Sequence, residues 1–187
     1  MLIDTSLANN LLVAMPSLSL PEYKKAVIYV CENHINGSVG LIINRPMQYP
    51  LDWMFKQMHI VPTGIKQNKQ PLLFGGAVQP ERGFVIHRPV GGWKSSLALR
   101  DGVTVTTSND IIHALAAETG PKDSLVTLGY TGWEEGQLEQ EVKSGIWLIC
   151  PFKSELLYEV PFNMRWDYAG SLLGIKMDQL TSTIGHA

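Results

Sequence analysis

The sequence contains no long apolar segment and no run of basic residues, and each absence argues against a class of protein. No stretch approaches the roughly 20 apolar residues that a membrane-spanning helix needs, and no basic segment precedes the short apolar run near the N-terminus. We therefore expect neither a signal peptide nor a membrane association. The net charge of −2 provides no general attraction for nucleic acid, so we expect no specific DNA binding.

Cysteine is also scarce. Cys31 and Cys150 lie far apart in the sequence, each within an apolar segment that is typical of a buried strand. Without a secretory signal, the expected state is two reduced, packed thiols in a cytoplasmic protein.

Motifs that identify common enzymes are missing. The sequence has no phosphate-binding loop, no dinucleotide-binding glycine pattern, no nucleophile elbow, no zinc-protease motif and no C-x-x-C pair. No helix-turn-helix pattern is evident either. We therefore expect no cofactor and no metal ion.

What is present describes a globular domain. Apolar residues make up 45% of 187 residues, which is enough for one domain with a sizeable core. Asn36-Gly37 and Asp101-Gly102 are strong hairpin signals because these residues tolerate positive φ angles. Predicted strands cover residues 11–15, 26–31, 39–43, 72–74, 83–87, 97–99, 103–107, 125–128, 146–150 and 156–160. Predicted helices cover residues 5–10, 51–58, 109–118, 134–143, 164–173 and 177–183. This mixture predicts an α/β fold bordering on α+β, with a mixed sheet in a single domain over residues 1–187.

Residues 125–150 form the pattern around which the prediction is organised. A buried strand is followed by a turn at Gly132-Trp133, an amphipathic helix, and a second apolar strand. This order is typical of a βαβ unit, which predicts that the two strands are neighbours in one sheet. Ser108 is predicted to cap the preceding helix at residues 109–118.

Three short groups carry residue types that are used in catalysis or binding. Residues 31–34 place Cys31 near His34, which suggests an activated thiolate, although a packed cysteine is the commoner outcome. Glu81 and Arg82 suggest a pair that orients a polar ligand or serves a hydrolytic enzyme, or else a structural ion pair. Asn44-Arg45 suggests either a ligand-facing strand end or a turn.

A fourth group combines glycines with aromatic rings. Gly129, Tyr130, Gly132 and Trp133 predict a shallow cleft where backbone approaches a ligand or partner, or else tight packing that needs glycine. The glycines leave little bulk around Trp133, which favours a cleft position over a core position for its ring.

Five sequence blocks resemble the AlgH (YqgE) family of bacterial proteins, whose function is not established. They are residues 12–16 (LVAMP), 30–46 (VCENHINGSVGLIINRP), 75–88 (GGAVQPERGFVIHR), 106–121 (TTSNDIIHALAAETGP) and 126–148 (VTLGYTGWEEGQLEQEVKSGIWL). The resemblance implies a single domain with a bent or bifurcated mixed sheet, close to a two-layer sandwich. The family usually has Cys-Glu-His-Asn where this chain has Cys31-Glu32-Asn33-His34, and this departure weakens any cysteine–histidine chemistry.

Members of the family are often described as transcriptional regulators, so the resemblance suggests a regulatory role. The favoured interpretation is a non-enzymatic protein that binds an unknown protein or small molecule in a shallow cleft. Two alternatives remain: an enzyme that uses Cys31 or the Glu81/Arg82 pair, and a DNA-binding regulator. A deep pocket with converging polar groups would distinguish an enzyme from a binding protein.

Overall fold

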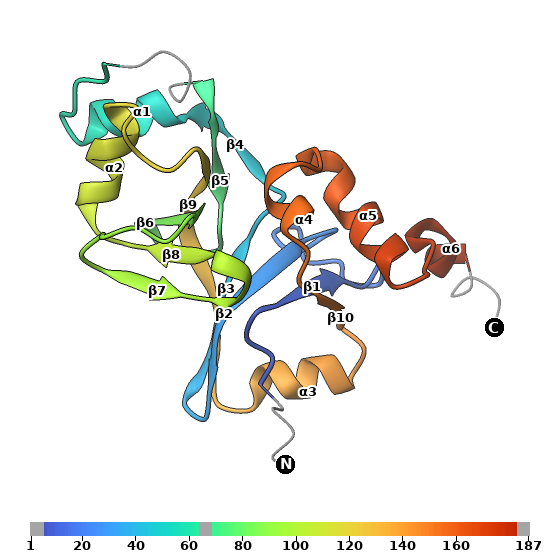
Figure 1. Cartoon of the computed structure of the whole chain (residues 1–187). Helices are drawn as coiled ribbons and strands as arrows, with labels where there is room; N and C mark the ends of the chain where they lie inside the picture. The colour runs from blue at the N-terminus through green and yellow to red at the C-terminus, as the bar shows by residue number, and fades with distance from the viewer. Residues whose placement is uncertain (1–5, 64–68, 183–187) are drawn as a thin grey trace.

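A computed structural model describes residues 6–63 and 69–182, and it shows one bent sheet with helices packed around it (Figure 1). The strands are β1 (Asn10–Ala14), β2 (Val27–His34), β3 (Gly37–Ile42), β4 (Pro46–Pro50), β5 (Pro71–Phe74), β6 (Val78–Arg88), β7 (Ser96–Ala98), β8 (Thr104–Thr106), β9 (Asp123–Trp133) and β10 (Trp147–Pro151). The α-helices are α1 (Leu51–Gln57), α2 (Asn109–Ala116), α3 (Gln137–Lys143), α4 (Ser154–Tyr158), α5 (Arg165–Leu172) and α6 (Met177–Ser182). No helix in the described ranges is long and apolar enough to cross a membrane.

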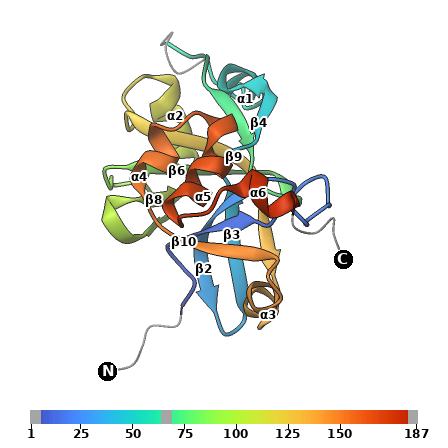
Figure 2. The same ribbon diagram turned by 90° about the vertical axis from the view of Figure 1, so that its right-hand side faces the viewer.

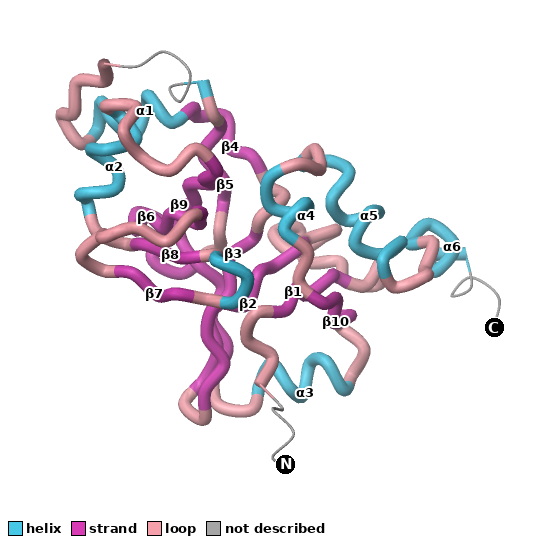
Figure 3. The backbone as a smooth tube through the Cα atoms, viewed as in Figure 1, coloured by secondary structure: helices cyan, strands magenta, loops and turns pink. Residues whose placement is uncertain are grey.

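Both predicted hairpins are confirmed. The β2–β3 hairpin has a two-residue loop between the paired residues His34 and Gly37, and it projects from the rest of the sheet (Figure 3). The β7–β8 hairpin turns at Asp101 and Gly102, whose φ angles are 57° and 73°. Both residues of the aspartate-glycine pair thus have positive φ angles, whereas in the asparagine-glycine pair only Gly37 does, with a φ angle of 131°.

Strand β9 lies at the centre of the sheet, where the sheet divides. One edge of β9 pairs with β6, while the other pairs in parallel with β5 at Thr127 and Leu128 and then antiparallel with β3 from Thr131 to Trp133. Gly129 lies at the switch with a φ angle of 72°. The predicted mixed, bifurcated sheet is therefore confirmed, and the strand order is β10-β1-β2-β3-β9-β6-β8-β7, with β5 branching from β9 and β4 pairing with β5.

The predicted βαβ unit is wrong. Strand β10 pairs antiparallel with β1, so β1, β2 and β3 separate it from β9. Gly132 and Trp133 do not form a turn, because they continue β9 and pair with β3. Helix α3 carries the chain from the end of β9 beneath the sheet to β10 at its far edge (Figure 1). A local pattern of strand, helix and strand does not specify which strand the second one pairs with.

Two further predictions of secondary structure fail. Residues 156–160 were expected to form a strand, but α4 occupies residues 154–158 and buries both Leu156 and Leu157. Two adjacent buried residues fit one face of a short helix docked in the core, whereas a strand would place them on opposite faces. The helix expected at residues 5–10 is a turn that leads into β1, as far as residues 6–10 describe it.

The core has three parts. The first lies where the curled sheet meets α4 and α5, which cover the sheet in the turned view of Figure 2. The second packs α1 and α2 against β5, β6 and β9, and the third packs α3 beneath β1, β2 and β3. In the first part, the buried guanidinium of Arg165 donates to the carbonyls of Ile43, Leu157 and Val160. Burial lowers the pKa of Arg165 to about 10, so it remains a cation that fastens α5 to the sheet.

Candidate binding cleft

Asn44 and Arg45 have structural partners. The Asn44 side chain accepts from the Val27 amide at 2.9 Å and donates to the Lys25 carbonyl at 2.8 Å. Arg45 donates to the carbonyls of Pro21 and Lys24, both at 2.8 Å. Both residues therefore fasten the loop before β2 to the end of β3, and neither faces the cavities described below.

Glu81 and Arg82 do not act as a pair. No salt bridge joins them among the residues that the structure describes. They lie where β6 leaves its register with β9, between Val78 and Gly83. Arg82 lines one cavity and Glu81 lines another, so consecutive residues serve different sides of the strand.

The cavity that contains Arg82 is a cleft of about 400 Å³, here called the strand cleft. Its lining comes from strands β2, β3, β6, β7, β8 and β9 and from residues flanking them. The lining residues are Cys31, Glu32, Val39, Leu41, Arg82, Phe84, Ser95, Ser96, Leu97, Val105, Thr107 and Tyr130. The volume falls within the range of small-molecule sites, and an apolar floor with a polar rim is their usual composition.

Arg82 is held at the rim of the strand cleft by weak contacts. Its guanidinium lies 5.2 Å from the centre of the Phe84 ring and donates to the Gln79 side chain at 3.2 Å. Tyr130 meets the same Phe84 ring edge-on, with 5.8 Å between centroids. No carboxylate of the described chain forms an ion pair with Arg82. Its donor fork is therefore available to a ligand.

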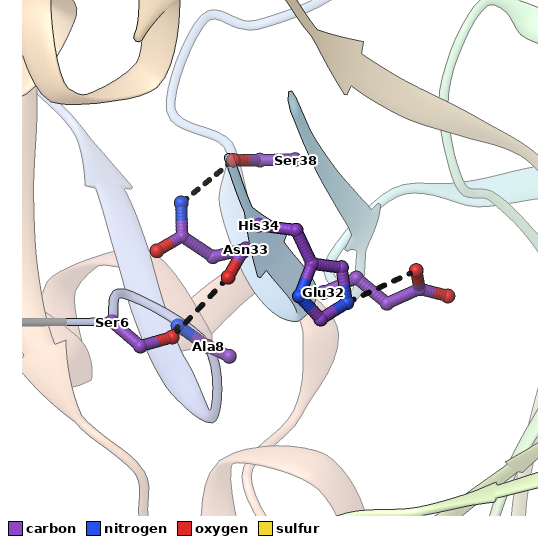
Figure 4. A network of polar contacts seen from close by, with 6 residues as sticks. All are labelled: Ser6, Ala8, Glu32, Asn33, His34 and Ser38. Atoms are coloured by element: carbon purple, nitrogen blue, oxygen red, sulfur yellow. Dashed lines mark hydrogen bonds and ion pairs between the residues drawn. The ribbon is translucent and has the colours of Figure 1, made fainter. Parts of the chain in front are cut away.

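Cys31 lies at the floor of the cleft and is 5% exposed. Its thiol contacts the Tyr29 carbonyl at 3.6 Å, and burial, together with the nearby Glu32, raises its pKa. His34 points outward and pairs instead with Glu32 at 3.6 Å (Figure 4). The arrangement does not provide the base that an activated thiolate needs.

Asn33 explains the departure of this chain from the Cys-Glu-His-Asn order. Its amide donates to the side chains of Ser38 and Glu139, both at 2.8 Å, and accepts from the Leu7 amide at 2.8 Å (Figure 4 shows the contact with Ser38). One side chain thus joins the N-terminal segment, β3 and α3. Asn33 is partly buried, whereas the imidazole of His34 is exposed.

Trp133 belongs to the core, which corrects the expectation that little bulk surrounds its ring. The residue is 6% exposed and meets Trp147 edge-on at 6.3 Å between centroids. Glu141 accepts from both indoles through the same oxygen, at 2.9 Å from Trp133 and 2.7 Å from Trp147. Trp133 and Gly132 do line a shallow depression that shares Glu32, Val39 and Tyr130 with the strand cleft.

Gly129 serves chain packing and does not line the strand cleft. A Cβ atom on Gly129 would lie 2.2 Å from the Gly76 carbonyl oxygen, and one on Gly75 would lie 2.3 Å from the Gly129 oxygen. Backbone therefore approaches backbone where the chain crosses from β5 to β6. Of the eight candidate residues, Arg82 and Tyr130 line the strand cleft, and Gly132 and Trp133 border it.

Sequence reasoning missed a polar chain beside the cleft. The buried His87 contacts Thr106 Oγ1 through Nε2 at 2.8 Å, and Thr106 contacts Ser96 Oγ at 2.7 Å. Burial lowers the pKa of His87, which favours a neutral ring whose Nδ1 donates to the Pro89 carbonyl at 3.1 Å. The chain joins β6, β8 and β7, and no local sequence motif reveals it.

Ser108 does not cap α2 with its side chain, contrary to prediction. Its hydroxyl accepts from the Ser95 amide at 3.1 Å and donates to Asp110. This hydrogen bond is the main reason that the pKa of Asp110 is lowered. The two residues fasten the loop before β7, at the rim of the strand cleft, to the start of α2.

Sequence comparison now connects this architecture to known proteins. The AlgH-like family model matches residues 11–178. The chain belongs to the AlgH-like family. A UPF0301 protein of Legionella pneumophila (strain Corby) is 63% identical over 187 residues and covers 100% of both chains. Another from Nitrosococcus oceani is 39% identical over 179 residues, or 96% of each chain.

Solved structures agree with the family assignment. The solution structure of the AlgH protein from Pseudomonas aeruginosa has a TM-score of 0.80 and 37% identity, covering 100% of this chain and 99% of that one. A Corynebacterium diphtheriae protein has a TM-score of 0.70 at 17% identity, covering 92% of this chain and 90% of that one, which shows likeness of fold. The family resemblance inferred from the sequence is therefore confirmed.

Proposed function

We propose that this AlgH-like protein is a non-enzymatic binding protein that takes a ligand with an apolar body and one acidic group in the strand cleft. The observation that carries the proposal is the Arg82 guanidinium, which lies over Phe84 at the cleft rim without an ion-pair partner among the described residues. A rigid donor fork beside an apolar floor suits a carboxylate attached to a hydrocarbon.

The remaining lining supports the same ligand class. Leu41, Phe84 and Val105 supply apolar surface, and Tyr130 contributes a phenol at the rim. Glu32 would repel an anion, but its carboxylate is directed to His34. A regulatory role, which the family resemblance suggests, would then act through this ligand.

An enzymatic function is less well supported. Burial favours the neutral thiol of Cys31, and Glu81 lies in a different cavity from Arg82. These facts leave neither a thiolate with its base nor a paired carboxylate and guanidinium. The absence of specific DNA binding, the cytoplasmic location and the binding of a protein or small-molecule partner remain predictions.

Hydrocinnamate, a phenyl ring with a short carboxylate chain, is a suitable probe for the proposal. For so small a ligand, a dissociation constant near 1 mM corresponds to about 4 kcal/mol of binding free energy. Amide chemical-shift mapping of labelled protein would measure it, with the shifts expected around Leu41, Arg82, Phe84 and Tyr130. Hydrocinnamamide, which lacks the charge, should bind about tenfold more weakly.

Arg82→Gln should weaken hydrocinnamate binding about tenfold because it removes the charged fork. Glu81→Gln is the matched control, since it changes the neighbouring charge but lies in another cavity. Equal binding by wild type and Arg82→Gln, or shifts that avoid the strand cleft, would refute the proposed function.

A further inference from the structure

The second cavity, here called the helix cavity, lies between α1, α2 and the face of the sheet opposite the strand cleft, and its volume is about 420 Å³. Its walls are mostly apolar: Trp53 and Met54 come from α1, Met58 follows that helix directly, Ile112 comes from α2, and Val85 and Leu128 come from the sheet. The size and lining match those of small-molecule sites. Nothing in the proposed function uses this cavity.

Trp53 is positioned as a platform for a flat ligand. Tyr49 stacks on its ring with 4.6 Å between centroids and an interplanar angle of 26°. Trp53 lines the helix cavity and Tyr49 does not, so Tyr49 supports the ring from outside the cavity. An aromatic ligand beside Trp53 would therefore add to an existing stack, and such offset contacts favour flat rings.

Methionine side chains complete the apolar wall. Met54 lies on α1 and Met58, four residues later, caps its C-terminal end, and both line the helix cavity. Thioethers are flexible and polarisable, and they make favourable contacts with aromatic ring edges. This wall adapts to a ring without requiring one exact shape.

The polar lining determines which ring is preferred. Glu81 is the one ionisable side chain in the lining of the helix cavity, and the other polar side chains of the lining are those of Gln57, Thr106, Thr107, Ser108 and Asn109. An isolated carboxylate accepts hydrogen bonds from N–H groups and repels anions. The strand cleft has the opposite preference because it contains Arg82.

We propose that the helix cavity is a second binding site, which takes a planar, nitrogen-containing aromatic ring with N–H donors and no negative charge. In this site, the ring stacks against Trp53 between the methionines and α2, and its donors face the Glu81 carboxylate at the mouth.

The probe that tests the site is 2-aminobenzimidazole, a flat bicyclic ring with N–H donors along one edge. Amide chemical-shift mapping should place its effects on residues 53–58, 81–83 and 106–112, with a dissociation constant of about 1 mM or tighter. Hydrocinnamate should leave the amides of residues 53–58 and 108–112, which belong to the helix cavity alone, unchanged. Shifts elsewhere, or no binding at several millimolar probe, would overturn the proposal.

Two substitutions test the roles of the residues. Glu81→Gln should weaken binding of 2-aminobenzimidazole about tenfold, and Trp53→Leu should weaken it by at least as much, because each removes one of the two recognition elements. Arg82→Gln is the control and should leave the dissociation constant unchanged. Unchanged binding of 2-aminobenzimidazole by Glu81→Gln would overturn the proposal. Because Glu81 is exposed, we expect this variant to fold, so the test holds even if Trp53→Leu is unstable.

Tyr49 tests whether the ring of Trp53 must be supported. Tyr49→Leu should weaken binding of the probe a few-fold, whereas Tyr49→Phe should retain it, because phenylalanine preserves the stack. Equal loss in both variants would contradict the stacking role, since Tyr49 does not line the cavity.

Discussion

The strand cleft and the helix cavity have nearly equal volumes, about 400 and 420 Å³, but opposite chemistry. Arg82 lines the first and Glu81 lines the second, although they are consecutive residues of β6. The two cavities therefore share a strand, but the Arg82 guanidinium lines only the strand cleft and the Glu81 carboxylate lines only the helix cavity. Two charged residues that are adjacent in the sequence therefore need not belong to the same site, because consecutive side chains of a strand point to opposite faces of the sheet.

The two cavities also depend on one structural feature. Strands β6 and β9 contribute to both, and β6 reaches them only after the crossing at Gly75 and Gly76. Damage to the crossing should affect both cavities, whereas changes in the lining should affect one.

The largest effect is expected from Gly76→Ala. The added Cβ would lie 2.1 Å from the carbonyl carbon of Tyr130, and the φ angle of Gly76 is 155°. The contacted atoms are backbone, so the expected loss in unfolding free energy exceeds about 4 kcal/mol, with loss of both ligand sites. Chemical denaturation would measure it.

Gly83→Ala is the control for this substitution. A Cβ on Gly83 meets no atom within 4 Å, so its stability should stay close to that of the wild type. If Gly76→Ala unfolded at the same denaturant concentration as the wild type, the connection between β5 and β6 would tolerate a side chain at Gly76. The argument that both cavities depend on this connection would then fail.

Two tryptophans provide the next comparison. Trp133→Ala should cost about 3–5 kcal/mol because the ring is buried and its loss leaves a cavity. Trp53→Ala should cost nearer 1 kcal/mol because Trp53 is half-buried and already borders a cavity. Urea titrations of both variants would test the order, and a reversed order would contradict the assignment of Trp133 to the core and Trp53 to a cavity wall.

Much of the fold was predictable from local signals. The Asn36-Gly37 and Asp101-Gly102 pairs located both hairpins because positive φ angles restrict the residues at tight turns. The partner of β10 was not predictable, because pairing with β1 depends on contacts between residues more than 130 positions apart, such as Leu12 and Ile149. The strand predicted at residues 156–160 was wrong for a related reason. Packing of Leu156 and Leu157 against the core, and not local propensity, makes that segment a helix.

Half of the candidate site residues line or border the strand cleft. The others lie outside it for reasons that the structure makes clear. Gly129 was recognised as a point of close approach, but the approaching group is the backbone of Gly76 in the connection between β5 and β6. Asn44 and Arg45 are satisfied by distant carbonyl or amide groups that no local motif specifies. The helix cavity was missed because Met54 and Met58 form the apolar stripe that every buried helix has.

A smaller effect is expected from His87, which joins the strands beside both cavities. Burial lowers its folded pKa below the unfolded value of about 6.5, so the unfolded chain binds the proton first. The stability that neutral His87 contributes is complete above about pH 6.5 and is lost as the pH falls toward the folded pKa. The slope is at most about 1.4 kcal/mol per pH unit.

His87→Gln should remove this part of the pH dependence. The measurement is the difference in unfolding free energy between wild type and variant at pH 7.5, 6 and 5. A difference that stays constant with pH would show that His87 does not titrate differently in the folded and unfolded states.

The thiols should have almost no effect on stability when a reductant is added. Cys31 and Cys150 are free and buried in the same core, and burial raises the pKa of both. We expect an unchanged melting temperature with strong reductant and slow alkylation of the folded chain. A loss of several degrees would contradict this, since a native disulfide contributes about 2–4 kcal/mol.

The smallest effect on stability should come from removing single charges on β6, and these substitutions also test most directly whether the two cavities are separate sites. Glu81 and Arg82 are exposed, and no salt bridge joins them, so Glu81→Gln and Arg82→Gln should each change the unfolding free energy by less than about 0.5 kcal/mol. Each substitution should nevertheless weaken the binding of a different probe. Arg82→Gln should weaken only hydrocinnamate and Glu81→Gln only 2-aminobenzimidazole, each about tenfold. If either substitution weakened both probes equally, the two cavities would behave as one site, and the separation that the structure indicates would have no consequence for binding.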